Sequence, residues 1–308
     1  MIAITGFSGF VGRHLLPLLD KEECLLLGRK APSDDNNFCE FNLAAANKCD
    51  LINLLKPVCT LIHAAARVHV MSDRAIDPLA EFRAVNTIGT LQLAEQAAEA
   101  GVKRFIFLSS IKVNGESTTN QQPFSAHDNP MPVDPYGISK LEAEQQLVKL
   151  GKKTGMEIVI IRPPLVYGYG VKANFASLMK CVTKGVPLPL KAIKNNKRSL
   201  ISVYNLADLI FECINNPNAA NKIFLASDNH DISTAEMIAL MAKAQGINNF
   251  AFSVPISTFL LIGKLFKKQD MVDRLTGSLQ VDITHTTQTL NWHPPYSIEH
   301  GFKLAIKK

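Results

Sequence analysis

Tyr136 and Lys140 place a phenol and an ammonium group four positions apart at the start of a sequence typical of a helix. Side chains at i and i+4 lie on one face of a helix, so the lysine can approach the tyrosine hydroxyl. A free tyrosine titrates near pH ~10, and a charge ~6 Å away at an effective dielectric of ~20 stabilises the phenolate by about 3 kcal/mol. The pair therefore predicts a tyrosine that exchanges a proton with a sugar or alcohol hydroxyl. A plain surface helix would show the same spacing, so other motifs have to support this chemistry.

A second motif lies at the N-terminus, where a short strand over 2–5 leads into a glycine-rich turn and a helix. Its glycines allow a tight turn, close approach of the backbone to a pyrophosphate, and close packing of the helix on the strand. The helix N-terminus offers unpaired N–H groups to the phosphates. The dinucleotide-binding residues predicted for this turn are Gly6, Phe7, Ser8, Gly9, Phe10, Val11, Gly12 and Arg13.

The residues after the second expected strand, over 24–27, bear on the choice of dinucleotide. NAD-preferring sites usually carry an acidic residue here for the adenosine ribose. This chain has Gly28-Arg29-Lys30 instead, with Arg13 just beyond the glycine turn. These cations favour the 2′-phosphate of NADP, although solvated loop charges would explain them too, and NAD stays open as the alternative.

Two further strands are expected to end beside the dinucleotide. The strand over 59–62 opens into small residues that leave room for a cofactor at the carboxyl edge of an open sheet. The strand over 102–108 ends in two serines whose hydroxyls would face the same cleft. His63 has no acidic partner nearby in the sequence and is expected to be mainly structural. The residues predicted to line this part of the cofactor site are Arg29, Asn42, Leu43, His63, Ala64 and Ala65.

Strands and helices alternate over the first half of the chain, which predicts an α/β fold with a Rossmann-type doubly wound parallel sheet. The less regular remainder predicts a smaller C-terminal substrate-binding lobe. We therefore expect a dinucleotide-binding domain over 1–165 and a mainly substrate-binding lobe over 166–308, with segments near 198–228 returning to the first domain. Further helices are expected over 78–100, ended by Gly101, over 205–213 and 233–245, with Asn205 and Ser233 as N-caps, and over 254–267.

The composition is that of an ordinary globular chain of 308 residues, 47% of them hydrophobic, with a net charge of +6. The positive charge is scattered, which argues against nucleic-acid binding and suits an anionic small molecule. The six cysteines form no Cys-x-x-Cys pair, so free thiols and a reducing compartment are expected.

The sequence shows no signal peptide and no apolar run of ~18 residues, so a cytoplasmic protein without a transmembrane segment is expected. The apolar segment over 254–266, followed by two lysines, could lie on a membrane surface. A helix packed on its own domain is the favoured interpretation of that segment.

The ordered motifs resemble those of the extended short-chain dehydrogenase/reductases that act on nucleotide sugars, the NAD-dependent epimerase/dehydratase family. The resemblance covers almost the whole chain. The matching motifs are Thr5-Gly6-x-x-Gly9-x-x-Gly12, His63-x-Ala65, Asn86-x-x-Gly89-Thr90, Ser109-Ser110, Tyr136-x-x-x-Lys140, Arg162-Pro163-x-x-Val166-Tyr167-Gly168, Arg198-x-x-x-x-Val203 and Leu290-Asn291-Trp292.

The resemblance implies roles for individual residues. Tyr136 would be the acid/base, Lys140 would hold the cofactor ribose and lower the tyrosine pKa, and Ser110 would share the substrate proton. Pro163 would contact the cofactor. The resemblance also implies a homodimer in which the helices near 78–100 and 134–150 form a four-helix bundle. The residues implied for the substrate are Ser109, Ser110, Asn174, Arg198 and Arg274, the last three for the nucleotide diphosphate.

The family's 4,6-dehydratases follow their hydroxyl residue with Asp-Glu, whereas this chain has Ile111 and Lys112. Isoleucine cannot transfer a proton, so 4,6-dehydration is not expected. Hydride transfer at C4 of a nucleotide-activated hexose or N-acetylhexosamine, most simply a UDP-sugar, is expected instead. Because Arg29 favours NADP, a 4-keto-sugar reductase is slightly favoured, and a UDP-glucose or UDP-N-acetylglucosamine 4-epimerase is the alternative. A non-sugar ketone reductase and a non-catalytic dinucleotide-binding protein are weaker alternatives.

Overall fold

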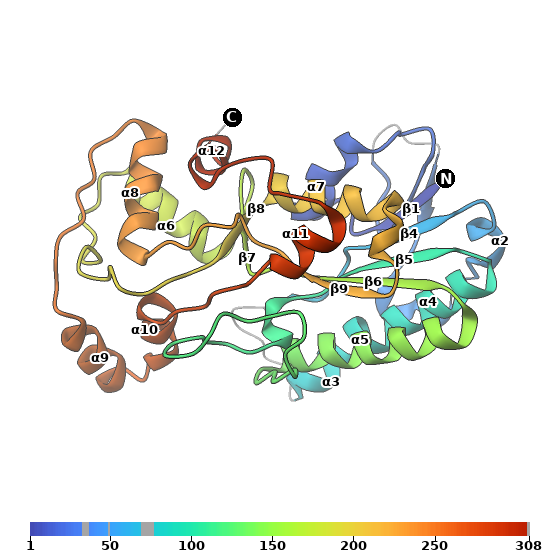
Figure 1. Ribbon diagram of the computed structural model, residues 1–308, viewed down its shortest axis with the longest axis horizontal. Coiled ribbons are helices and arrows are strands. Elements are labelled where there is room, and N and C mark those ends of the chain that lie inside the picture. The colour runs from blue at the N-terminus through green and yellow to red at the C-terminus, as the bar shows by residue number, and fades with distance from the viewer. Residues whose placement is uncertain (33–36, 49, 69–76, 307–308) are drawn as a thin grey trace.

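The computed structural model describes residues 1–32, 37–48, 50–68 and 77–306. A seven-stranded parallel sheet with helices on both faces makes up the larger part, and a mostly helical lobe lies beside it (Figure 1). The strand order, β3-β2-β1-β4-β5-β6-β9, reverses direction between β1 and β4. The strands are β1 (Ile2–Thr5), β2 (Cys24–Gly28), β3 (Phe38–Glu40), β4 (Thr60–His63), β5 (Arg104–Leu108), β6 (Glu157–Arg162) and β9 (Lys222–Leu225). This confirms the predicted Rossmann-type doubly wound fold.

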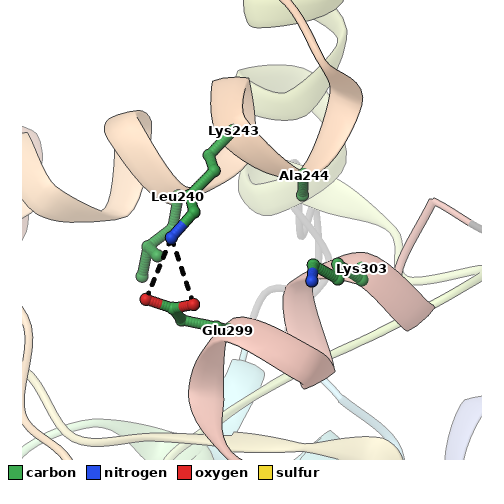
Figure 2. Close-up of a pocket in the computed structure, with 5 residues that line it drawn as sticks. All are labelled: Leu240, Lys243, Ala244, Glu299 and Lys303. Atoms are coloured by element: carbon green, nitrogen blue, oxygen red, sulfur yellow. Dashed lines mark hydrogen bonds and ion pairs between the residues drawn. The ribbon is translucent and has the colours of Figure 1, made fainter.

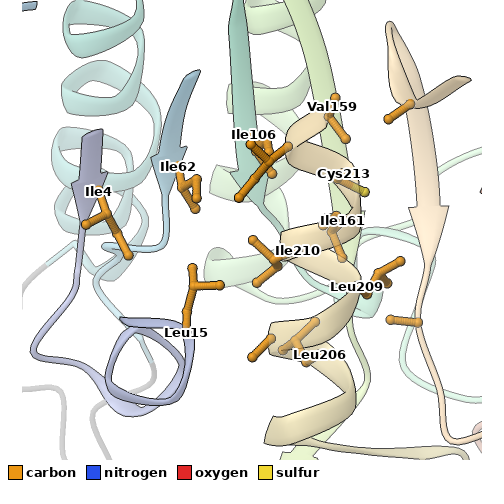
Figure 3. Packing of buried hydrophobic residues seen from close by; sticks show 14 of the residues in the cluster. Ile4, Leu15, Ile62, Ile106, Val159, Ile161, Leu206, Leu209, Ile210 and Cys213 are labelled. Atoms are coloured by element: carbon orange, nitrogen blue, oxygen red, sulfur yellow. The ribbon is translucent and has the colours of Figure 1, made fainter. Parts of the chain in front are cut away.

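One face of the sheet packs on α1 (Phe10–Leu15) and α7 (Val203–Asn215). Figure 3 shows Ile62 and Ile106 of the sheet pointing toward Ile210 of α7. Successive strand residues face opposite sides, so alternate residues of the same strands fill a second core. That core packs on α2 (Ile52–Leu55), α4 (Thr90–Glu99) and α5 (Pro135–Thr154). The sheet is therefore a rigid platform whose carboxyl edge positions the side chains that follow each strand.

The helix predicted over 78–100 is interrupted. It consists of α3 (Pro78–Phe82), the π-helical segment η3 (Arg83–Gly89) and α4. Within η3, the buried Asn86 amide donates to the Ser139 hydroxyl at 3.1 Å and Thr87 donates to the Ser139 carbonyl at 2.9 Å. These bonds tie η3 to the start of α5 and account for the irregular turn. The helix ends before Gly101, whose φ of +87° is the left-handed conformation expected after a helix.

The smaller lobe is built around a third core and joins the sheet through a two-stranded parallel ribbon. Tyr167, Phe175 and Phe302 pack against one another at its centre, with the rings of Tyr167 and Phe175 stacked. Its elements are β7 (Leu165–Tyr167), β8 (Leu200–Ser202), α6 (Ala173–Thr183), α8 (Thr234–Gln245), α9 (Ile256–Leu265), α10 (Gln269–Thr276) and α12 (Ile298–Leu304), while α11 (Thr284–Leu290) contacts β9. The short helices are η1 (Leu16–Leu18), η2 (Leu43–Lys48), η4 (Ile111–Val113) and η5 (Pro217–Ala219).

One predicted helix cap is confirmed and one is wrong. Ser233 caps α8 by accepting the Glu236 backbone N–H. The N-cap of α7 is Ser202, which accepts the Asn205 N–H at 3.1 Å, so Asn205 does not have the capping role predicted for it. Its side-chain amide is buried and donates to Asp228 at 2.7 Å and to the Tyr296 carbonyl at 2.8 Å. Asn205 therefore links α7 to the lobe.

Of the helices that the structure describes, none is long and apolar enough to cross a bilayer.

Candidate active site

The first turn of α5 presents Tyr136 and Lys140. Asp134 caps the helix by accepting the Gly137 N–H at 2.6 Å, and Pro135 occupies the first helical position, where its missing N–H costs nothing. The helix therefore begins immediately before Tyr136. The Lys140 Nζ lies 6.0 Å from the centre of the Tyr136 ring, which confirms that the two side chains share one face.

Lys140 is almost completely buried, with 1% of its surface exposed. Its Nζ donates to the Leu108 carbonyl at 2.8 Å and lies 4.4 Å above the centre of the Phe107 ring. Burial lowers the pKa of Lys140 to about 7, although the nearby Glu144 carboxylate acts in the opposite direction. The lysine is thus held at the end of β5, and its charged and neutral forms are both populated near pH 7.

Tyr136 is held as a neutral phenol. Burial raises its pKa above the ordinary value, the Asp134 charge raises it further, and a hydrogen bond with Ser110 acts in the opposite direction. Lys140 is not among the causes of this shift, so the lowering of the Tyr136 pKa expected from Lys140 is wrong. Ser110 is the residue that pairs with the Tyr136 hydroxyl, so the structure brings the three predicted catalytic side chains, those of Ser110, Tyr136 and Lys140, to one place.

Ser109 lies in a different environment from Ser110. It is buried and donates a hydrogen bond to Oε1 of Glu144 on α5. Glu144 forms an ion pair with Arg162, whose Nη2 lies 2.5 Å from Oε2 and whose side chain is 2% exposed. Asn114 completes the group by accepting from Arg162 Nη1 at 2.9 Å. The Ser109 hydroxyl therefore bonds to Glu144, and the cluster links the ends of β5 and β6 next to Ser110.

His63 lies between two threonine hydroxyls. Its Nδ1 is 2.6 Å from Thr5 Oγ1, its Nε2 is 2.9 Å from Thr90 Oγ1, and its ring stacks on Phe107. Burial lowers its pKa to about 3, with a further contribution from Lys140. His63 is therefore a neutral histidine between two neutral hydroxyls, which is consistent with the mainly structural role predicted for it.

The glycine turn lies where the strand order reverses, between β1 and β4. Gly6 has a φ of +74°, and a Cβ there would lie 2.5 Å from the Ala65 nitrogen and 2.6 Å from the Ala64 carbonyl carbon. A Cβ at Gly12 would lie 2.3 Å from the Gly6 oxygen, so the helix packs directly on the turn. Open α/β sheets bind dinucleotides at such a reversal, with pyrophosphate on the glycine turn. The backbone geometry and the neighbouring small residues fit a dinucleotide.

Other predicted cofactor residues surround this turn in different settings. Phe7 is buried, with its ring beneath Gly28, and Arg13 Nε donates to the Ser8 carbonyl at 2.9 Å. Arg29 is exposed at the end of β2, and Asn42 is exposed with its side-chain oxygen accepting from Ala44. The remaining ones are Leu43, which is buried against Gly89, Phe10 and Val11 in α1, and Pro163, whose carbonyl accepts the Ile111 N–H.

Two of the predicted diphosphate residues lie together. Arg198 Nη1 donates to the Arg274 carbonyl at 3.1 Å and to the Gly277 carbonyl at 3.3 Å. Burial, followed by the neighbouring Arg274 charge, lowers the pKa of Arg198. Asn174 is exposed at the start of α6. The Arg198 guanidinium therefore lies against the Arg274 backbone and is influenced by the Arg274 charge and, in the opposite direction, by the Glu116 charge.

Glu144, Asn114 and the cluster in which Lys112 forms ion pairs with Glu116, at 2.9 Å, and with Asp134 were not predicted from the sequence. Glu144 could have been noticed as an acidic residue one turn after Lys140 on the same helix. Lys112 had been considered only as a replacement for an acidic residue. The structure shows that it anchors Asp134, the cap of the helix that carries Tyr136.

A small cavity of about 10 Å³ lies elsewhere, between α8 and α12 (Figure 2). Lys243 and Glu299 line it and form an ion pair of 3.1 Å. Its volume corresponds to a single water molecule. Its lining contains none of the predicted site residues, so it does not belong to the candidate active site.

The dinucleotide fold, its glycine turn and the Ser110, Tyr136 and Lys140 group define an enzyme of the extended short-chain dehydrogenase/reductase class. A family model described as the NAD dependent epimerase/dehydratase family matches residues 2–226. The chain belongs to that family. The predicted family and enzyme class are thereby confirmed.

Three comparisons illustrate the likeness. A Vibrio cholerae protein described as UDP-glucose 4-epimerase is 52% identical over 306 residues, 98% of this chain and 93% of that protein. The structure of a UDP-glucose 4-epimerase from Thermotoga maritima with UDP-glucose has a TM-score of 0.78 at 22% identity, covering 99% of this chain and 96% of that one. A UDP-glucuronic acid 4-epimerase from Bacillus cereus in complex with NAD has a TM-score of 0.76 at 21% identity, covering 98% and 96%. The two structures support the fold.

Proposed function

We propose that this protein is a nucleotide-sugar 4-epimerase that inverts the configuration at C4 of a UDP-hexose such as UDP-glucose. The observation that carries the proposal is the 52% identity, over nearly the whole of both chains, with the V. cholerae UDP-glucose 4-epimerase. The sequence analysis slightly favoured a 4-keto-sugar reductase, and the comparisons support the alternative better. Both activities require hydride transfer at C4, which the site's hydroxyl, phenol and lysine suit.

The proposed acid/base chemistry rests on Tyr136 and Ser110. A bound nicotinamide dinucleotide supplies the acceptor and donor of the C4 hydride. As the phenolate, Tyr136 would take the proton of the C4 hydroxyl during oxidation, and the resulting phenol would return it to the C4 oxygen during reduction, with Ser110 hydrogen-bonded to the same oxygen. Lys140, in its charged form, stabilises the phenolate. Since burial holds the phenol neutral, proton transfer depends on the Ser110 hydrogen bond and the charge of Lys140 acting against that burial.

We propose NAD as the resident dinucleotide. The glycine turn would take the pyrophosphate, Lys140 the ribose next to the nicotinamide, and Asn42 and Leu43 the adenine. The family and the NAD-bound relative support NAD, whereas only the cations Arg29, Lys30 and Arg13 favoured NADP. Arg13 already donates to the Ser8 carbonyl, and Arg29 is a solvent-exposed charge.

For the substrate, we propose that Arg198 and Arg274 bind the nucleotide diphosphate, with Asn174 beside it. Two guanidinium groups held close together repel each other, and a bridging diphosphate relieves that repulsion through charge-assisted hydrogen bonds. Ser109 is proposed to position the tip of β5 through Glu144, and its contact with the sugar remains a prediction.

Arg29 supports a second candidate, a 4-keto-sugar reductase that uses NADPH. One experiment separates the two. Purified protein without added cofactor is incubated with UDP-glucose, and separately with a UDP-4-keto-6-deoxyhexosamine and NADPH. The proposal expects UDP-galactose in the first reaction and no NADPH oxidation in the second. The reverse pattern would establish the reductase, and turnover in neither would favour a non-sugar substrate or a non-catalytic role.

We also propose a homodimer formed by the helices near 78–100 and 134–150. Both carry exposed apolar side chains, Ile88 at the end of η3 and Val148 on α5. Light scattering at micromolar concentration should give twice the mass of the 33.8 kDa chain.

A further inference from the structure

We infer that α9 and the lysines at its end form a docking surface for a membrane rich in anionic lipids. Apolar side chains on this short helix face solvent. Leu261 is 69% exposed, Leu265 73% and Phe266 65%. Large exposed apolar patches are rare on monomeric soluble proteins, and they often mark sites of interaction with proteins or membranes.

The packing of α9 explains why these side chains face outward. Gly263 is its buried residue, and a Cβ there would lie 2.7 Å from Val272 Cγ2 on α10. Because successive helical residues are rotated by about 100°, positions two before and two after Gly263 point away from α10. These positions are Leu261 and Leu265, which are four residues apart and form one apolar ridge. Figure 1 places α9 at the outer end of the lobe, away from the sheet.

The charged residues in the segment that carries this ridge are all lysines. The sequence from 250 to 268 contains three lysines and no acidic residue. Lys264, Lys267 and Lys268 are exposed, and none of them forms an ion pair within the described part of the chain. The acidic residues that follow, Asp270 and Asp273, belong to α10. An apolar ridge edged with lysine complements a membrane surface whose headgroups are anionic.

The chemistry of the patch selects lipid over the other possible partners. The cores of protein–protein interfaces are depleted in lysine, whereas interfacial helices combine lysine with leucine and phenylalanine. A ten-residue helix is about half the length needed to span a bilayer, so α9 would lie in the interface. This inference is independent of which sugar the enzyme uses.

The test is sedimentation of the full-length protein with phosphatidylcholine vesicles that contain either no phosphatidylglycerol or about a quarter of it. The wild type should pellet with the anionic vesicles and remain largely in solution with neutral ones. L261S/L265S should reduce binding at least about tenfold. Replacing the lysines by K264Q/K267Q/K268Q should reduce it by roughly fivefold per lysine at low salt. L18S, at an exposed leucine in η1, is the matched control and should bind like the wild type.

Activity on a soluble nucleotide sugar should be unchanged in all of these variants, which shows that they fold. Failure of the wild type to pellet with anionic vesicles would overturn the inference. So would equal binding by L261S/L265S and by the wild type. If L261S/L265S instead changes the oligomeric state measured by light scattering, the ridge contacts a second copy of the chain, and the membrane assignment is wrong.

Discussion

The substitution Glu144→Gln should strongly destabilise the protein. Its carboxylate accepts from Ser109 and pairs with Arg162, and both members of the ion pair are at least 97% buried. Removing one charge leaves the Arg162 guanidinium without an anionic partner in a site that water does not reach. Breaking a buried pair in this way costs about 3–5 kcal/mol. At about 2 °C per kcal/mol for a large domain, the melting temperature should fall by about 6–10 °C.

Glu142→Gln is the matched control, two residues away on the same helix. Glu142 pairs with Arg83 at 2.5 Å in a partly exposed position, so its loss should change stability much less than that of the buried Glu144. Urea unfolding followed by circular dichroism gives the free energy of unfolding for each variant. Replacing both buried partners, in E144M/R162M, should recover much of the loss, because it removes both charges together. Equal effects of E144Q and E142Q would refute the view that this ion pair braces the site.

Three further perturbations test the surrounding structure. Burial lowers the pKa of Lys140 to about 7 from its ordinary 10.5. Above pH ~10.5 the lysine is neutral in both the folded and the unfolded chain, and as the pH falls toward 7 the unfolded chain binds a proton that the folded protein does not. The free energy of unfolding therefore falls over this pH range. Lys140→Met should therefore raise the free energy of unfolding more at pH 7 than at pH 10.5, and an equal gain at both would contradict the assignment. Ser202→Ala should cost about 1 kcal/mol in urea unfolding by removing the cap of α7, and Ser202→Thr, which keeps the hydroxyl, should cost less. Gly89→Ala places a Cβ 2.2 Å from the Leu43 carbonyl oxygen, so it should cost about 1–3 kcal/mol, and unchanged thermal unfolding would show that this backbone can yield.

The parts of the fold that the sequence predicted are those with a strong local signal. Buried strands read as apolar runs, and the glycine turn and the Tyr136–Lys140 spacing are local patterns. β3 was not predicted, because three residues with mixed exposure carry little periodicity. The break in the helix over 78–100 was missed for another reason. It depends on Asn86 and Thr87 bonding to Ser139, more than fifty residues away in the chain.

The pKa shifts in the site also could not be predicted from local sequence patterns. The spacing of Tyr136 and Lys140 gave their geometry correctly, yet the pKa of each depends on burial by residues from several elements. Asn205 illustrates the same limit. Its residue type suits an N-cap, but Ser202 lies three residues earlier in the extended conformation that capping requires. The residues that Asn205 does contact, Asp228 and Tyr296, come from distant segments of the chain.

The most direct test of the central claim follows the hydrogen at C4. UDP-glucose carrying deuterium at C4 is incubated with the purified protein and no added cofactor, and the product is analysed by NMR and mass spectrometry. An epimerase returns the same hydride, so the account predicts UDP-galactose that retains the deuterium, and no product with Tyr136→Phe. Absence of conversion, loss of the deuterium, or undiminished turnover by the Tyr136→Phe variant would contradict it.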